Sequence, residues 1–203
     1  MRSQTDANLI FDAELHRYFH KGMAVPGVNE IIEGAGLVDF SMVPEAQLEA
    51  ACKLGEYVHL TTALWDKKNL NEDKLSPGLI PYLKGWKKFE GDFKIEFTGE
   101  QIERRLYSTK WRFAGTTDRD PVLIDGKWTL VDLKTSTTMQ KAYALTTAGY
   151  KILQEENLNV KIKQRWAVQL LPDGTYKIHV YDKPTDESVF LSCLNIFNWK
   201  KGA

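Results

Sequence analysis

The sequence predicts an α+β fold, in which a central mixed β-sheet is flanked by helices. Three short segments alternate apolar and polar residues as half-buried strands do, near 101–107, 112–118 and 128–134. Longer segments have the spacing of amphipathic helices, near 45–65, 78–92, 139–156 and 186–199. Strands that are grouped between helices in this way are typical of an α+β domain.

The first third of the chain is expected to be a small sheet followed by helices. Residues 8–20 alternate enough to indicate a strand or hairpin before a helix near 28–34, for which Asn29 is a suitable cap. On the helix expected at 45–65, one face should point into the protein, and it carries Leu48, Cys52, Gly55 and His59. A glycine inside a helix costs about 1 kcal/mol relative to alanine, so this glycine indicates a close approach by another group.

The last third should contain a helix, a hairpin and a second helix. A serine- and threonine-rich segment at 135–138 is expected to cap the helix that runs to Glu156. Two alternating segments, 165–170 and 176–181, flank the turn-forming residues 172–175 and predict a hairpin. The final helix begins with acidic residues and ends with basic ones, an order that suits its dipole.

Two segments in the middle of the chain carry the residues that are most informative about chemistry. They are Gly-Thr-Thr-Asp at 115–118 and Val-Asp-Leu-Lys-Thr at 131–135. Alternation along a strand puts Asp132 and Lys134 on one face and their apolar neighbours on the other. Between the segments, Asp125 and Gly126 favour a type I′ turn, so we expect neighbouring strands that bring Asp118 close to Asp132. Neighbouring carboxylates repel each other unless a cation lies between them, and oxygen ligands suit Mg²⁺ or Mn²⁺ better than zinc.

In this order and spacing, the two segments resemble the core of the PD-(D/E)XK nuclease superfamily. Most of the chain resembles the exonuclease branch of that superfamily, which includes RecB-type, Cas4-type and phage recombination nucleases. The resemblance implies a restriction-endonuclease-like core that hydrolyses phosphodiester bonds with one or two Mg²⁺ or Mn²⁺ ions. It also implies that Asp118, Asp132 and the backbone carbonyl of Leu133 hold the metal. Lys134 would orient the attacking water or neutralise charge on the phosphate.

Two residues outside these segments are further candidates for the metal site. The segment from Leu54 to His59 is similar to the Gly-x-x-x-His element of the branch, which implies that His59 approaches the metal; a histidine satisfied within the core is the alternative. Glu103 stands where relatives carry an acidic residue on the preceding strand. It is expected to be a metal ligand or an orienting carboxylate, and the competing interpretation is a cross-strand partner for a lysine or arginine.

One motif of the branch is altered in this chain. Residues 145–150 resemble its Gln-x-x-x-Tyr element, which implies that Tyr150 contacts the strand being cut. Thr146 occupies the position of the glutamine, and a threonine side chain reaches less far from the same helical face. Gln140 and Gln169 are the candidates to replace it.

Composition limits the class of protein. The 203 residues, with 43% apolar content, predict one nuclease domain over 1–203, with a hairpin and helices in 1–95 and the catalytic sheet, its helix and the last hairpin and helix in 96–203. The only cysteines, Cys52 and Cys193, are too few for the four-cysteine iron–sulfur cluster of some relatives. We find no long apolar run or signal peptide in the sequence, whose first eight residues are polar, so we expect a cytoplasmic protein without membrane contact.

The function expected from this sequence is that of a metal-dependent DNA exonuclease of phage or bacterial recombination or repair. Its substrate would be linear DNA, duplex or single-stranded, and the resemblance leaves room for a recombination partner protein and for an oligomer. A structure-selective endonuclease on the same core is one alternative. A DNA-binding or assembly protein without catalytic activity is another, favoured by Thr146 and by the balance of 27 basic against 27 acidic residues.

Overall fold

The computed structural model describes residues 6–202, in a mixed α+β fold as the sequence predicts. Residues 1–5 of the polar start lie outside the described part. The first half of the chain contains a three-stranded antiparallel sheet and then three α-helices. The strands are β1 (Leu9–Asp12), β2 (Arg17–His20) and β3 (Met23–Val25), and the helices are α1 (Val28–Gly34), α2 (Glu45–Asp66) and α3 (Ile80–Phe93). The strand or hairpin expected at 8–20 is therefore confirmed and extends by one strand.

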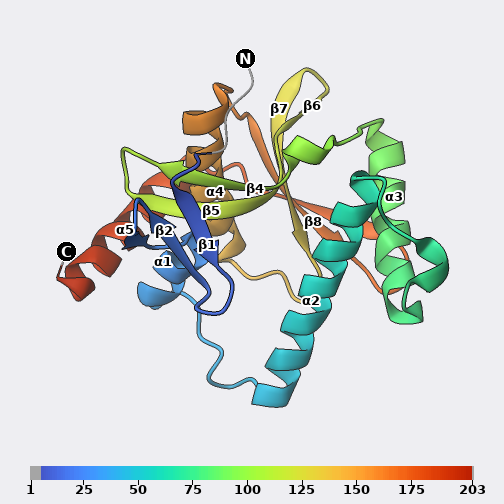
Figure 1. The fold of residues 1–203 in the computed structure, drawn as a ribbon, viewed down its shortest axis with the longest axis horizontal. Helices are drawn as coiled ribbons and strands as arrows, with labels where there is room; N and C mark the ends of the chain where they lie inside the picture. Colours follow the sequence, from blue (N-terminus) through green and yellow to red (C-terminus); the bar gives the residue numbers. More distant parts are fainter. Residues whose placement is uncertain (1–5, 203) are drawn as a thin grey trace.

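The remainder of the chain contains six strands and two helices (Figure 1). They are β4 (Ile102–Ser108), β5 (Phe113–Arg119), β6 (Val122–Ile124), β7 (Lys127–Lys134), α4 (Tyr143–Leu158), β8 (Gln164–Leu170), β9 (Tyr176–Val180) and α5 (Asp186–Lys201). Strands β6, β7, β8 and β9 form a mixed sheet in that order, in which β7 and β8 are parallel and α4 connects them. Asp125 and Gly126 both have positive φ, 49° and 73°, which confirms the expected turn between β6 and β7.

Asp118 lies close to β7, as expected, although β5 and β7 do not pair as strands. Strand β5 pairs with β4 in a separate two-stranded sheet. One edge of β7 is taken by β8, and on the other edge β6 pairs only as far as Thr129. The edge of β7 beyond Thr129 faces Asp118 instead, whose Oδ2 accepts a hydrogen bond of 2.6 Å from the backbone N–H of Leu133. A side-chain hydrogen bond therefore joins the two segments in place of a backbone ladder.

Two apolar cores support the sheets. The first core lies between the mixed sheet, α2 and α3, and its fully buried members include Trp86, Phe89, Leu133 and Val168. The second core lies between α1, α4, α5 and the β4–β5 sheet, around Ile31, Phe113, Leu153 and Phe190. Each of these side chains stabilises the fold by roughly 1.5–3 kcal/mol through burial. As predicted, the apolar face of β7 packs into the first core, so its polar face is available for the site.

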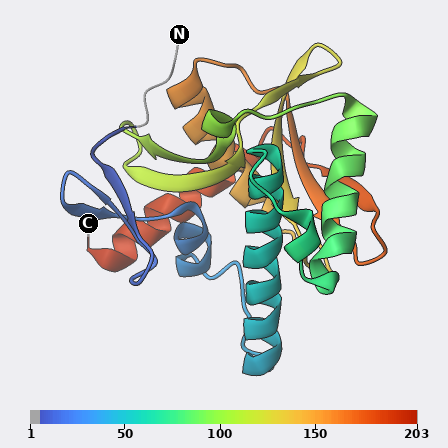
Figure 2. The ribbon, with the colours of Figure 1, turned by 45° about the vertical axis from the view of Figure 1, so that its right-hand side comes forward.

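Helix α2 packs through its C-terminal half. Figure 2 shows its N-terminal half extending away from the rest of the molecule. Its buried side chains begin at Val58, whereas Cys52, which we expected to point inward, is exposed. A helix of this length spans about 33 Å, so only part of it reaches the sheets. Among the helices formed by the described residues, none combines the length and apolar character needed to cross a membrane.

Two expected helix caps are absent. Helix α1 begins after Gly27, whose N–H donates to Glu30 Oε2 at 3.3 Å, so Asn29 lies within the first turn and does not cap it. Helix α4 begins at Tyr143 after Ala142, without a side-chain cap from the segment at 135–138. The first of these corrections matters for the site, because Asn29 keeps its side chain for other contacts.

Candidate active site

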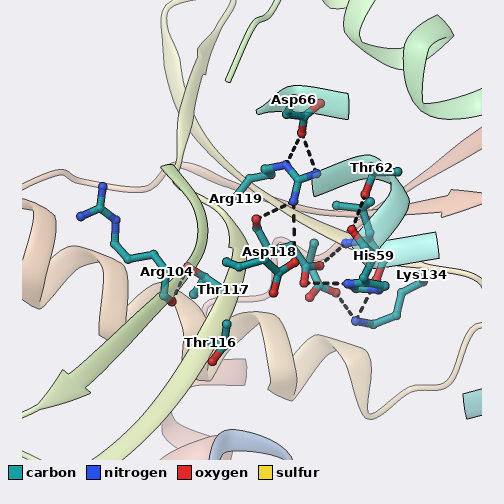
Figure 3. A network of polar contacts seen from close by, with 12 residues as sticks. His59, Thr62, Asp66, Arg104, Thr116, Thr117, Asp118, Arg119 and Lys134 are labelled. Atoms are coloured by element: carbon teal, nitrogen blue, oxygen red, sulfur yellow. Dashed lines mark hydrogen bonds and ion pairs between the residues drawn. The ribbon is translucent and has the colours of Figure 1, made fainter. Parts of the chain in front are cut away.

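Three elements bring three of the predicted site residues together. His59 comes from α2, Glu103 from β4 and Asp118 from β5, and one potential ligand atom of each lies within 4.8 Å of the others. His59 Nδ1 is 3.0 Å from Asp118 Oδ1 (Figure 3). Since Leu133 N–H holds the other oxygen of Asp118, both oxygens of this carboxylate are fixed.

Glu103 reaches this group through an unusual backbone conformation. It faces Asp118 across the β4–β5 sheet, between the pairs Ile102↔Arg119 and Arg104↔Thr117, and its φ of +53° is in the left-handed region. That conformation costs a residue with a side chain roughly 1–2 kcal/mol, and such costs are concentrated at functional sites. Glu103 Oε1 is also 3.9 Å from Arg119 Nη1, so its carboxylate borders both the arginine and the group formed with His59 and Asp118.

Asp132 and Lys134 form the second half of the site on the polar face of β7. Lys134 Nζ is 2.6 Å from Asp132 Oδ2 and donates a hydrogen bond of 3.2 Å to the carbonyl of Leu133. The lysine thus contacts two of the groups to which the resemblance assigns a metal. Asp132 itself is 2% exposed and lies outside the group of three formed by His59, Glu103 and Asp118.

The electrostatics of the three carboxylates differ sharply. Burial opposes ionisation of Asp118, but His59, Lys134 and the Leu133 N–H outweigh it and hold the pKa of Asp118 well below its usual range. Burial raises the pKa of Asp132 to about 6, with Asp118 adding to the shift and Lys134 opposing it. Burial and the charge of Asp118 raise the pKa of Glu103 to about 7. The site therefore holds more acidic groups than its local positive charge can keep ionised.

The cationic and phenolic groups respond to the same negative charge. Burial lowers the pKa of His59 and of Lys134, but Asp118 in the first case and Asp132 in the second reverse the effect, so both pKa values are raised. Lys134 is therefore protonated near neutral pH. Burial, followed by the charges of Asp132 and Asp118, raises the pKa of Tyr150 well above its usual value, so its hydroxyl keeps its proton.

The residues present fit a divalent cation. Among the described residues, Glu103 Oε1 is a buried carboxylate oxygen without a hydrogen-bond partner, with Arg119 Nη1 3.9 Å away, whereas Asp132 Oδ2 is paired with Lys134. Buried polar atoms of this kind require an explanation, and a hard cation that accepts oxygen and imidazole ligands supplies one. The Leu133 carbonyl adds a neutral oxygen beside them.

Sequence reasoning missed a buried ion pair behind Asp118. Arg119 is 0% exposed and places Nη2 2.6 Å from Asp66 Oδ2, while its Nη1 donates to the backbone carbonyl of Asp118 at 2.7 Å (Figure 3). Trp86 Nε1 donates to the other oxygen of Asp66 at 2.8 Å. Arg119 thus fixes the backbone that presents Asp118. The available signal was the spacing of Asp66, two helical turns after His59 on the same face of α2.

Three hollows open around the site. The largest, about 550 Å³, is lined by His59, Glu103, Lys67 and Asn29 among others. The second, about 380 Å³, is lined by Tyr150, Tyr18, Arg17 and Asn29, and the third, about 140 Å³, by Lys134, Gln140, Thr146 and Asn29. Tyr150 and Lys134 therefore border adjoining spaces on either side of Asn29.

The basic residues on α3 do not belong to this site. Lys87 pairs with Glu72 at 2.6 Å and lies over the ring of Trp65, and Lys88 pairs with Asp92 at 2.6 Å. These contacts favour a solvated helix face over a nucleic-acid contact.

Comparison with known proteins gives a likeness in structure alone. The chain matches no protein-family profile and no curated protein in sequence. A crystal structure from Eubacterium rectale, described as that of a candidate exonuclease, is 13% identical, with 75% of this chain and 68% of that chain covered at a TM-score of 0.47. The crystal structure of SSO0001 is 15% identical, with 74% of this chain and 71% of that chain covered at a TM-score of 0.39. Likeness at this level does not assign a function, which depends on the chain's own side chains.

Proposed function

We propose that the chain is a metal-dependent deoxyribonuclease of the PD-(D/E)XK type, folded as one domain, that removes nucleotides from the ends of linear DNA. The observation that carries the proposal is the convergence of His59, Glu103 and Asp118 beside the Asp132–Lys134 pair. The Gly-x-x-x-His and tyrosine elements, which are typical of the exonuclease branch, favour action at ends over endonucleolytic cutting. We further propose that the protein is cytoplasmic and serves recombination or repair, as the resemblance implies.

The cation would be held by Asp118, Asp132 and the Leu133 carbonyl, with His59 and Glu103 completing its surroundings. A divalent cation supplies the positive charge that activates a water molecule and stabilises the leaving oxyanion. Asp118 suits this role because it stays ionised and both its oxygens are fixed. The raised pKa values of Asp132 and Glu103 mean that charge from outside the protein is needed to ionise the whole set.

Lys134 acts in this proposal as a fixed positive charge and a hydrogen-bond donor. Its raised pKa makes it unsuitable as a general base near neutral pH. Its ammonium can stabilise the charge that develops on the phosphate, or orient the attacking water, from its place between Asp132 and the Leu133 carbonyl. Tyr150, which keeps its proton, would donate a hydrogen bond to the strand being cut.

The test is cleavage of end-labelled linear duplex, linear single strand and closed circular DNA, with Mg²⁺, Mn²⁺ or EDTA. We expect loss of linear DNA only, and only with metal. Asp118→Asn and Lys134→Ala should each lower the rate by a factor of about 100 or more, whereas the control Asp73→Asn, at an exposed carboxylate on another surface, should not. Cleavage by Asp118→Asn at the wild-type rate would refute the proposal, and cutting of circular DNA would indicate an endonuclease.

A further inference from the structure

Thr146 occupies the position at which the resemblance leads one to expect a longer amide side chain, and it has acquired a partner from another helix. Its hydroxyl donates a hydrogen bond of 3.3 Å to Oδ1 of Asn29, which lies 117 residues earlier on α1. Since Asn29 does not cap its own helix, this is the contact that orients its side chain. Because Oδ1 accepts from Thr146, the amide N–H groups of Asn29 take no part in this contact.

Asn29 lies at the junction of the hollows around the site. It is exposed, and it lines all three hollows around the site. Each of these hollows has one lysine or arginine in its wall beside one or two glutamates: Lys67 with Glu56 and Glu103 in the largest, Arg17 with Glu30 and Glu33 in the second, and Lys134 with Glu33 in the third. Basic groups spaced along connected hollows are suited to a phosphate backbone, and an amide N–H at their junction can donate to a phosphate oxygen.

The two glutamines that the sequence offered as replacements are less suitable. Gln169 is 4% exposed, donates to the carbonyl of Ser136 at 2.7 Å and pairs with His179 at 3.0 Å, so its amide is used within the protein. Gln140 lines only the smallest hollow. Within residues 6–202, the amide nitrogen of Asn29 donates no hydrogen bond, so it is free to bind a ligand.

We infer that the amide nitrogen of Asn29, oriented by the Thr146 hydroxyl, binds a phosphate oxygen of the DNA strand next to the bond that is cut. This inference rests on the proposed nuclease function and deepens it. The pair from α1 and α4 supplies, from two short side chains, the amide donor that one long side chain at position 146 would supply. The altered motif is then compatible with an active enzyme, because the donor has moved to another helix.

The decisive variant is Asn29→Asp, which keeps the shape and the acceptor for Thr146 but replaces the amide donors with a negative charge. Strand affinity is measured by fluorescence anisotropy with a single-stranded oligonucleotide in EDTA, in an Asp118→Asn background so that no cleavage occurs. We expect the affinity to fall about tenfold or more, since a hydrogen bond to an ionised group is lost. Asn29→Ala should give a smaller loss, and Asn195→Ala, an exposed asparagine on α5, should give none.

A second experiment moves the amide from position 29 to position 146. In the double variant Asn29→Ala/Thr146→Gln, the amide is removed from α1 and returned on α4 in the space that was vacated. We expect it to recover most of the affinity lost in Asn29→Ala, and, in protein with Asp118 intact and metal present, to recover KM more than kcat. Thermal midpoints within about 2 °C of the parent would show that the fold is intact.

The outcomes separate this inference from the proposed function. Unchanged affinity in Asn29→Asp would overturn the inference while leaving metal-dependent cleavage intact. If Gln140→Ala then lost affinity, the amide donor would be Gln140 instead. Failure of the double variant to recover affinity, with its fold intact, would also overturn it. A wild-type protein that binds the strand through Asn29 but cleaves no DNA would support the inference and refute the proposed hydrolysis.

Discussion

A single backbone angle distinguishes Glu103 from the other candidate ligands. The left-handed φ of +53° interrupts a strand in order to present a carboxylate opposite Asp118. The sequence placed Glu103 on a strand near the site, but not this conformation, because a glutamate carries no signal for positive φ as glycine or asparagine does. The strained backbone of Glu103 thus places its carboxylate opposite Asp118.

Glycine usually destabilises a strand relative to alanine, but the left-handed conformation at position 103 predicts the opposite order. In metal-free protein, Glu103→Gly should be more stable than Glu103→Ala by about 1 kcal/mol, since only glycine adopts this φ without strain. Urea unfolding of the two variants measures the difference, and both should have lost metal-dependent cleavage. Equal stabilities, or a more stable alanine variant, would show that the backbone at position 103 is not left-handed.

Glu90 is a second residue whose environment has a measurable effect. Its Oε2 accepts a hydrogen bond of 2.8 Å from Trp65 Nε1, while burial and the charge of Asp66 raise its pKa to about 7. The folded state therefore binds this proton more tightly than the unfolded state does. Its contribution to stability is complete below the unfolded pKa and is lost as pH rises through the folded value.

Accordingly, the free energy of unfolding of the wild type should decrease between about pH 4.5 and pH 7 relative to that of Glu90→Gln, which cannot ionise. The difference should reach about 1 kcal/mol, allowing for screening at this half-buried position. Denaturant unfolding at pH 5 and pH 8 measures it. The matched control is Glu96→Gln at an exposed glutamate, and a parallel pH dependence in Glu90→Gln and wild type would contradict the prediction.

The strands and helices could be predicted from the periodicity of the sequence, but the pairing of the strands and the contacts between helices could not. The turn at Asp125 and Gly126 and the inward face of β7 have local signals, and both predictions are confirmed. The separation of β5 from β7 depends on which edges β6 and β8 occupy, which is a property of the assembled sheet. The contact between Asn29 and Thr146 joins two helices that are distant in sequence, so no local pattern could indicate it.

Close packing between α1, α4 and α5 leads to a prediction about glycine. A Cβ at Gly149 on α4 would lie 2.9 Å from Phe190 and 2.9 Å from Val28, so Gly149→Ala should destabilise the protein by about 1–3 kcal/mol. Gly91 on α3 has open space at the same position, and Gly91→Ala should stabilise by about 0.5–1 kcal/mol. Thermal unfolding compares the two, and a Gly149→Ala protein as stable as Gly91→Ala would contradict this packing.

At the scale of the whole molecule, folding brings acidic groups together that only a cation can fully compensate. Mn²⁺ should therefore raise the thermal midpoint, with about 2.7 kcal/mol of stabilisation at one hundred times the dissociation constant. Differential scanning fluorimetry across a metal titration measures the shift. Asp118→Asn should remove most of it, whereas Asp73→Asn should not, and an identical shift in all three proteins would place metal binding elsewhere.

The position of the site relative to the two cores has a further consequence. His59 and Leu133 belong to elements that pack in the first core, whereas Asn29, Thr146 and Tyr150 belong to helices that pack in the second. Glu103 and Asp118 lie on the β4–β5 sheet, which packs in the second core as well, so the groups proposed to hold the cation are supported from both cores. A change in the packing of either core can therefore shift the cation site, whereas the groups proposed to hold the strand depend on the second core alone.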